Sequence, residues 1–144
     1  MTEEEVGHAI IGAAIKVHSV LGPGLLESAY ETCLLHELEK RNLPARRQAL
    51  IAIRYEDLTI YNGYRIDLLV ADRVVVELKT VETILPVHRG QLLSYLRLGS
   101  FKLGCLLNSM SLICAMGSSG WSMACNPLSP SRILRALCGE ALFF

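Results

Sequence analysis

The amino-acid sequence predicts an α/β domain, because helical and strand-like patterns of apolar residues alternate along residues 1–108. Two helical patterns come first and three strand-like stretches follow. One further helix and one further strand complete the series, so the predicted element order is αα-βββ-α-β. A chain of 144 residues is long enough for one domain with a modest hydrophobic core.

Two helices are predicted near the N-terminus. Thr2 and Glu5 have the spacing of a capping box, and apolar residues recur with helical spacing over about residues 3–20. The segment 21–24, which contains two glycines and a proline, is a strong helix break. A second apolar stripe then predicts a helix over about residues 25–41.

Strand-like segments follow the second helix. The β-rich stretches 49–54, 64–70 and 74–79 predict three strands, separated by turn-forming residues. Pro86 suits the first turn of a third helix, which Gly99 ends. The residues after that glycine, up to position 108, are expected to form a last short strand.

The C-terminal segment has a different composition. Residues 109–144 hold three charged side chains, on Arg132, Arg135 and Glu140, whereas the first 108 residues hold 25. We therefore expect a domain over residues 1–108 and an atypical, weakly charged tail over residues 109–144, with one weak helical pattern in the second half of the tail. A weakly charged tail of this length suits an interface, so a protein partner or a homo-oligomer remains open.

Charge and cysteine content limit the possible function classes. Lys and Arg together number 14, as do Asp and Glu, so any nucleic-acid binding must be local. The acidic residues 1–5 are unlike a secretory signal, and polar residues interrupt the longest weakly polar stretch, residues 103–116. Five cysteines without a C-x-x-C pair are typical of a reducing compartment. We expect a cytoplasmic protein without a membrane partner.

A predicted hairpin carries the most informative local pattern. Val70 and Val74 flank a three-residue loop, and pairing them places Asp67 opposite Glu77. Lys79 lies two residues beyond Glu77 and shares its face, so three ionisable groups are expected to converge. The other face is expected to be apolar core, formed by Ile66, Leu68, Val70, Val74, Val76 and Leu78.

The chemistry of this group points to a metal ion. Two facing carboxylates repel each other unless a positive charge lies beside them. Lys79 supplies part of that charge, and Mg²⁺, which one or two carboxylates usually hold, could supply the rest. A water on such an ion is a nucleophile near neutral pH, which suits phosphodiester hydrolysis. Asp67, Glu77 and Lys79 could equally form exposed surface ion pairs, and the spacing alone leaves that alternative open.

Five short motifs occur in order along about residues 5–108. They are G-x-x-E-x-x-Y at 24–30, G-Y-R-x-D at 63–67, E-L-K at 77–79, L-P-V-H at 85–88 and Q-x-x-x-Y at 91–95. In this combination the chain resembles the PD-(D/E)XK nuclease superfamily. It resembles in particular the RecB-type branch with a Q-x-x-x-Y helix and the small bacterial GxxExxY proteins. The resemblance implies a restriction-endonuclease-like core, a mixed sheet of about four strands flanked by helices.

The same resemblance implies roles for individual residues. The implied metal ligands are Glu27, Asp67, Glu77 and the carbonyl oxygen of Leu78. The implied catalytic group is Asp67, Glu77, Lys79, Gln91 and Tyr95. The ion would be Mg²⁺ or Mn²⁺, and the partner would be nucleic acid, with DNA favoured. Taken as residues alone, Glu27 also suits a helix N-terminus, and Gln91 and Tyr95 also suit core packing.

These patterns leave three functional alternatives. The first is metal-dependent hydrolysis of phosphodiester bonds in nucleic acid. The second is a catalytically inactive nuclease-like module that binds nucleic acid or a protein partner. The tail differs from the short basic segment that the resemblance implies after the last strand, so the third is a product whose folding is impaired.

Overall fold

The computed structural model describes residues 1–110, 113–117 and 121–125. Helices α1 (Glu3–Leu21) and α2 (Glu27–Lys40) precede strands β1 (Ala45–Tyr55), β2 (Leu58–Val70) and β3 (Val74–Lys79). Helix α3 (Pro86–Gly99) and strand β4 (Leu103–Asn108) follow, and β5 (Ile113–Gly117) and β6 (Trp121–Cys125) come last. The predicted α/β class and the order αα-βββ-α-β are confirmed.

The strands form one sheet in the order β1-β2-β3-β4-β5-β6. Strands β3 and β4 are parallel and the other neighbours are antiparallel, so the sheet is mixed. Helix α3 connects the two parallel strands, since a parallel pair needs a crossover. The first four strands are those that the sequence predicts. Strands β5 and β6 extend the sheet within residues 109–144, and the weak helical pattern of that segment lies outside the described residues.

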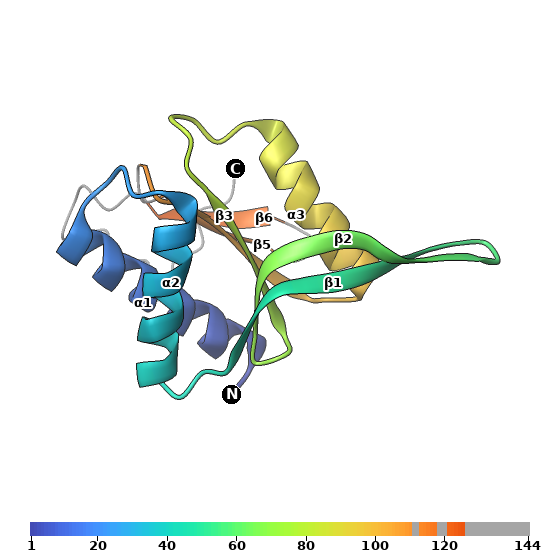
Figure 1. The fold of residues 1–144 in the computed structure, drawn as a ribbon, viewed down its shortest axis with the longest axis horizontal. Helices are drawn as coiled ribbons and strands as arrows, with labels where there is room; N and C mark the ends of the chain where they lie inside the picture. The colour runs from blue at the N-terminus through green and yellow to red at the C-terminus, as the bar shows by residue number, and fades with distance from the viewer. Residues whose placement is uncertain (111–112, 118–120, 126–144) are drawn as a thin grey trace.

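Two apolar clusters hold helices against opposite faces of the sheet (Figure 1). Side chains of α1 and α2 pack against β2, β3 and β4 in the larger cluster, and α3 packs against the other face. Because both faces are covered, β3 and β4 are apolar along most of their length. None of the helices in the described ranges has the length and apolar character needed to cross a membrane.

Local interactions set the ends of the first two helices. Glu5 N donates to Thr2 Oγ1 over 3.2 Å and Thr2 N donates to Glu5 Oε2 over 2.7 Å, which confirms the predicted capping box. Helix α2 begins at Glu27, slightly later than expected. The reason is that Gly22 and Gly24 have φ of 74° and 90°, so a left-handed backbone prolongs the break between the helices.

Strands β1 and β2 are longer than predicted and form a hairpin that projects beyond the helices (Figure 1). The turn-prone residue Gly63 lies within β2, where the register shifts between Ile51 and Ile53 of β1. A Cβ atom on Gly63 would collide with the Ile53 side chain. The glycine therefore allows close approach within the hairpin, and it does not end the strand.

Candidate functional site

The hairpin of β2 and β3 has the predicted register from its loop to Leu68 and Val76, and the predicted pair of Asp67 and Glu77 lies just beyond the paired residues. The paired residues are Val70 with Val74, Leu69 with Val75 and Leu68 with Val76. Beyond the last pair, Asp67 Oδ2 accepts a hydrogen bond of 2.8 Å from Leu78 N. The Asp67 carboxylate therefore satisfies a β3 backbone N–H just where the regular ladder stops. This interaction fixes the carboxylate at the edge of the β3 segment that carries Glu77 and Lys79.

One part of the predicted apolar face is wrong. The structure places Ile66 in the cluster under α3, with Leu69 and Val75. At the β1 position facing this part of β2, Gln48 has φ of 50°, and both strands curve (Figure 1). Simple alternation along a straight strand does not hold through such a bend. The other five predicted residues do share the cluster under α1 and α2: Leu68, Val70, Val74, Val76 and Leu78.

Glu77 and Lys79 form a partly buried ion pair on β3. Lys79 Nζ donates to Glu77 Oε1 over 2.6 Å. The second oxygen, Glu77 Oε2, is buried and has no hydrogen-bond partner in the described part of the chain. Burial raises the pKa of Glu77 to about 7, the Lys79 hydrogen bond opposes this, and the negative charge of Asp67 and the interaction between the two carboxyl groups add to it. Within the described part of the chain, one carboxylate oxygen of Glu77 is thus buried without a hydrogen bond.

The pKa values of Asp67 and Lys79 are also shifted by their surroundings. Burial raises the pKa of Asp67, while the Leu78 N–H and the positive charge of Lys79 act in the opposite direction. For Lys79, burial alone would lower the pKa, but the Glu77 hydrogen bond and charge, with Asp67, outweigh burial and raise it. The ammonium group therefore stays charged near neutral pH. Asp67, Glu77 and Lys79 form one electrostatic unit.

Glu27 is the first residue of α2 and lies close enough to this unit for their charges to interact. Its pKa is raised by partial burial and then by the charge of Asp67, while Lys79 lowers it. Its place in the first turn also suits the helix dipole, as expected for an acid there. The electrostatic coupling brings Glu27 into the vicinity of the site, and direct ligation of a metal by Glu27 stays a prediction.

Helix α3 brings Gln91 and Tyr95 to the same region. Gln91 Nε2 donates to Tyr95 Oη over 2.6 Å, one turn apart on one helix face. Tyr95 is buried; burial raises its pKa, Gln91 lowers it, and the charge of Glu77 raises it again. His88 stabilises the start of α3, because its Nδ1 accepts a hydrogen bond of 3.0 Å from Leu85 N.

A second buried carboxylate, which the sequence did not single out, lies one turn after Glu27. Glu31 Oε1 accepts from Arg47 Nε over 2.5 Å, and its Oε2 accepts from Gln48 Nε2 over 3.2 Å. The charge of Glu31 also raises the pKa of Asp67. The four-residue spacing between Glu27 and Glu31 could have indicated this carboxylate from the sequence, since it places both acids on one face of α2.

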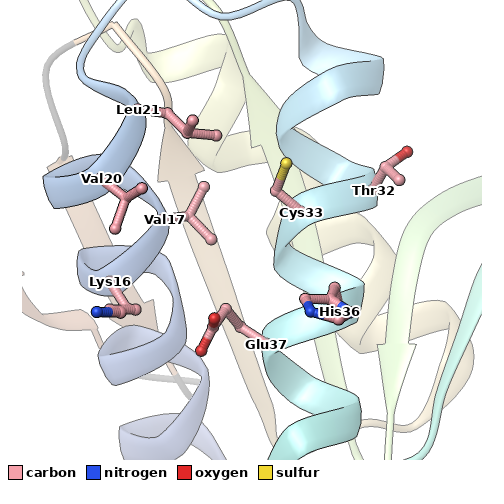
Figure 2. A pocket seen from close by; sticks show the side chains of 8 residues that line it. All are labelled: Lys16, Val17, Val20, Leu21, Thr32, Cys33, His36 and Glu37. Carbon is pink, nitrogen blue, oxygen red and sulfur yellow. The ribbon is translucent and has the colours of Figure 1, made fainter.

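Two pockets differ in their relation to these residues. A pocket of about 360 Å³ includes Gln91 and Tyr95, two of the predicted site residues, in its lining. A pocket of about 420 Å³ lies between α1 and α2, where Figure 2 shows Cys33, His36 and Val17 around it. No residue of the charged unit lines this larger pocket. Volume alone therefore does not identify the site.

The donor set fits a hard divalent ion. Across the described residues, no group of three or more His, Cys, Asp and Glu side chains lies close enough to hold a metal ion. Mg²⁺ needs fewer protein ligands, since one or two carboxylates and several waters usually hold it. Asp67 and the unpartnered Glu77 Oε2 meet that requirement. The residues present are thus compatible with Mg²⁺ or Mn²⁺.

Comparison with known protein families identifies the family of the chain. The family model of the PD-(D/E)XK nuclease superfamily matches residues 4–115 of the chain. No curated protein matches the chain. A solved structure described as "Crystal structure of SSO0001" is similar at 20% identity and a TM-score of 0.44, covering 92% of this chain and 71% of that chain.

Proposed function

The chain belongs to the PD-(D/E)XK nuclease superfamily, and from this membership we propose that it hydrolyses phosphodiester bonds of nucleic acid, with DNA as the favoured substrate. The observation that carries the proposal is the charged unit of Asp67, Glu77 and Lys79, in which Glu77 Oε2 has no hydrogen-bond partner among the described residues. Buried polar atoms rarely lack a partner, and such exceptions are typical of sites that bind a ligand.

The proposed metal ligands are the Asp67 and Glu77 carboxylates, with the Leu78 carbonyl oxygen and Glu27 as further ligands, the latter directly or through water. When bound, Mg²⁺ or Mn²⁺ supplies a nucleophilic water near neutral pH and stabilises negative charge on phosphate. The support from this chain is the shared location of the two carboxylates and the charge of Asp67 acting on Glu27.

The remaining side chains act on water and phosphate. The Lys79 ammonium is proposed to orient the attacking water or to contact a phosphate oxygen. Tyr95 accepts from Gln91, so its own O–H remains able to donate toward a phosphate oxygen. Gln91 is therefore a positioning residue that fixes the Tyr95 hydroxyl. A cytoplasmic location completes the proposal, supported by five cysteines without a C-x-x-C pair and by Cys33, which forms no disulfide with a described residue.

Cleavage assays with a matched lysine control test this proposal. Wild type and Lys102→Ala are expected to cleave linear, nicked or single-stranded DNA when Mg²⁺ or Mn²⁺ is present. Lys102 is exposed, and its Nζ lies 3.9 Å from Glu3 Oε1, so its ion pair involves none of the three residues of the charged unit. Lys79→Ala is expected to lose about 100-fold or more in rate, as for removal of a positioned catalytic group. Absence of cleavage by wild type, or full activity of Lys79→Ala, would contradict hydrolysis.

Thermal melts separate hydrolysis from binding alone. A working metal site stabilises the native state by RT ln(1 + [L]/Kd), about 2.7 kcal/mol at a hundredfold excess over Kd. Mg²⁺ is therefore expected to raise the Tm of wild type and not that of Glu77→Gln. A Tm that DNA raises but Mg²⁺ and Mn²⁺ leave unchanged would favour the catalytically inactive binding module. The same melts show whether each variant is folded.

A further inference from the structure

The pocket of about 360 Å³ lies between one face of α3 and Tyr64 of β2. The α3 residues that line it have the spacing i, i+3, i+4, i+7 and i+8, which is one continuous stripe of a helix. They are Val87, Gly90, Gln91, Ser94 and Tyr95. Because Gln91 and Tyr95 also belong to the proposed site, the pocket opens beside the place where a phosphate is proposed to react.

Two tyrosine rings form an aromatic wall of this pocket. The ring centroids of Tyr64 and Tyr95 are 5.3 Å apart, with an interplanar angle of 62°. Tyr95 is buried, whereas Tyr64 retains 39% of its accessible surface and offers ring surface to a ligand. Exposed aromatic side chains near a nucleic-acid site are typical platforms on which bases stack.

Polar groups on α3 lie next to this wall. Gln91 uses its Nε2 to donate to Tyr95 Oη, which leaves its carbonyl oxygen able to accept a hydrogen bond. Ser94 Oγ donates to Gly90 O over 3.0 Å, which leaves its oxygen lone pairs able to accept. An aromatic wall with nearby acceptors is complementary to a flat heterocycle that carries N–H donors at its edge.

Gly90 keeps the helix side of the pocket open. A Cβ atom at this position would meet no atom within 4 Å, so packing within the protein does not require glycine there. Glycine destabilises a helix interior relative to alanine. Its position on the stripe that lines the pocket means that a larger side chain would project toward the space beside Tyr64.

From these observations we propose that the pocket binds the base of an unpaired nucleotide adjoining the scissile phosphate. This inference rests on the proposed function and narrows its substrate class to single-stranded or frayed nucleic acid. A base inside a duplex is paired and stacked, so it cannot enter such a pocket without leaving the helix.

Binding without cleavage tests the pocket separately from hydrolysis. Fluorescence anisotropy in EDTA compares a short single-stranded DNA with an abasic strand of the same length. Wild type is expected to bind the base-bearing strand about fivefold tighter or more, the range typical of one base stacked on an aromatic side chain. Equal affinity for the two strands, or binding of neither, would overturn the proposal.

Tyrosine variants assign the preference to this pocket. Tyr64→Ala is expected to remove the preference for the base-bearing strand, and Tyr64→Phe, which keeps the ring, is expected to retain it. Tyr61→Ala is the matched control, because Tyr61 is on the same strand, is 77% exposed and does not line the pocket. A preference that survives Tyr64→Ala would overturn the proposal.

A filling variant provides a second, independent test. Gly90→Leu is expected to remove the base preference while the protein keeps a cooperative melt, since leucine favours the helix and meets open space. Retained preference in a folded Gly90→Leu protein would overturn the proposal. Cleavage of both strands with Mg²⁺ and no base preference would reject the pocket and keep hydrolysis. Base preference without any cleavage would reject hydrolysis and keep the pocket.

Discussion

Two buried carboxylates of this chain have opposite surroundings. Glu31 on α2 retains 5% of its accessible surface and Glu77 on β3 retains 3%. Both oxygens of Glu31 accept hydrogen bonds, from Arg47 and Gln48. Among the described residues, Glu77 Oε1 accepts from Lys79 and Glu77 Oε2 has no hydrogen-bond partner, and burial raises the pKa of Glu77 to about 7. The two side chains are almost equally buried, so their surroundings differ in the hydrogen bonds that the carboxylates accept.

The difference separates a carboxylate that joins two elements from the carboxylate that we propose as a metal ligand. A buried carboxylate with all its partners joins two elements at little net cost, here α2 and β1. A buried carboxylate with an unpartnered oxygen lowers stability, because the lost hydration of that oxygen is not replaced. We infer that the open position of Glu77 is retained for a ligand, whereas the Glu31 group holds the helix against the curved strand.

The largest expected effect concerns the apolar side of the β2–β3 hairpin, which carries Glu77. We expect its buried residues to contribute much of the stability of the fold. Leu68 is fully buried under α1 and α2. Leu68→Ala is expected to lower the free energy of unfolding by about 2–5 kcal/mol, because it removes packing and leaves a cavity. Urea titration measures this change. Leu50→Ala on neighbouring β1, where the side chain is exposed, serves as the control and is expected to change it by less than about 0.5 kcal/mol.

The next effect is the pH dependence that the unpartnered oxygen creates. The folded pKa of Glu77 is about 7 and its ordinary value is 4.5, so the folded state binds the proton more tightly than the unfolded state. This group therefore contributes stability below about pH 4.5 that is lost as pH rises through 7. Between pH 4.5 and 7 and without metal, the free energy of unfolding of wild type is expected to fall by up to about 3 kcal/mol relative to that of Glu77→Gln. Urea titrations at several pH values measure the difference.

The control for this pH effect is the other carboxylate. Glu31→Gln is expected to leave the wild-type slope between pH 4.5 and 7 largely in place, because the slope arises mainly from the large pKa shift of Glu77, with Asp67 and Glu27 adding to it. A slope that persists in Glu77→Gln and vanishes in Glu31→Gln would reverse the roles that the comparison assigns. Saturating Mg²⁺ is expected to flatten the wild-type slope, since a bound cation favours the ionised carboxylate.

The smallest expected effect distinguishes two adjacent arginines. Arg47→Ala leaves the buried Glu31 without its charged partner and is expected to lower the free energy of unfolding by about 1–3 kcal/mol. Arg46 pairs with Asp72, in the loop between β2 and β3, over 2.6 Å, and both side chains are exposed. Arg46→Ala is therefore expected to change the free energy of unfolding by less than about 1 kcal/mol. Chemical denaturation of both variants at pH 7 measures the effects. Equal losses would show that Glu31 does not depend on Arg47.

Much of the site was predictable because it is local. The β2–β3 register follows from a short loop and from alternation over a few residues, which together set which side chains lie opposite one another. The hydrogen bond from Gln91 to Tyr95 follows from a spacing of one helical turn. The Thr2 capping box is local in the same sense.

The sequence by itself thus determined the order of the elements, the hairpin register and the identity of the charged unit, since periodicity and short loops act over a few residues. Only the tertiary structure decided the side on which Ile66 packs, the partner of Glu31 and the pocket between α3 and Tyr64. These features join segments 16 or more residues apart, or depend on how the strands curve. Such contacts are set by the packing of whole elements, which local patterns do not specify.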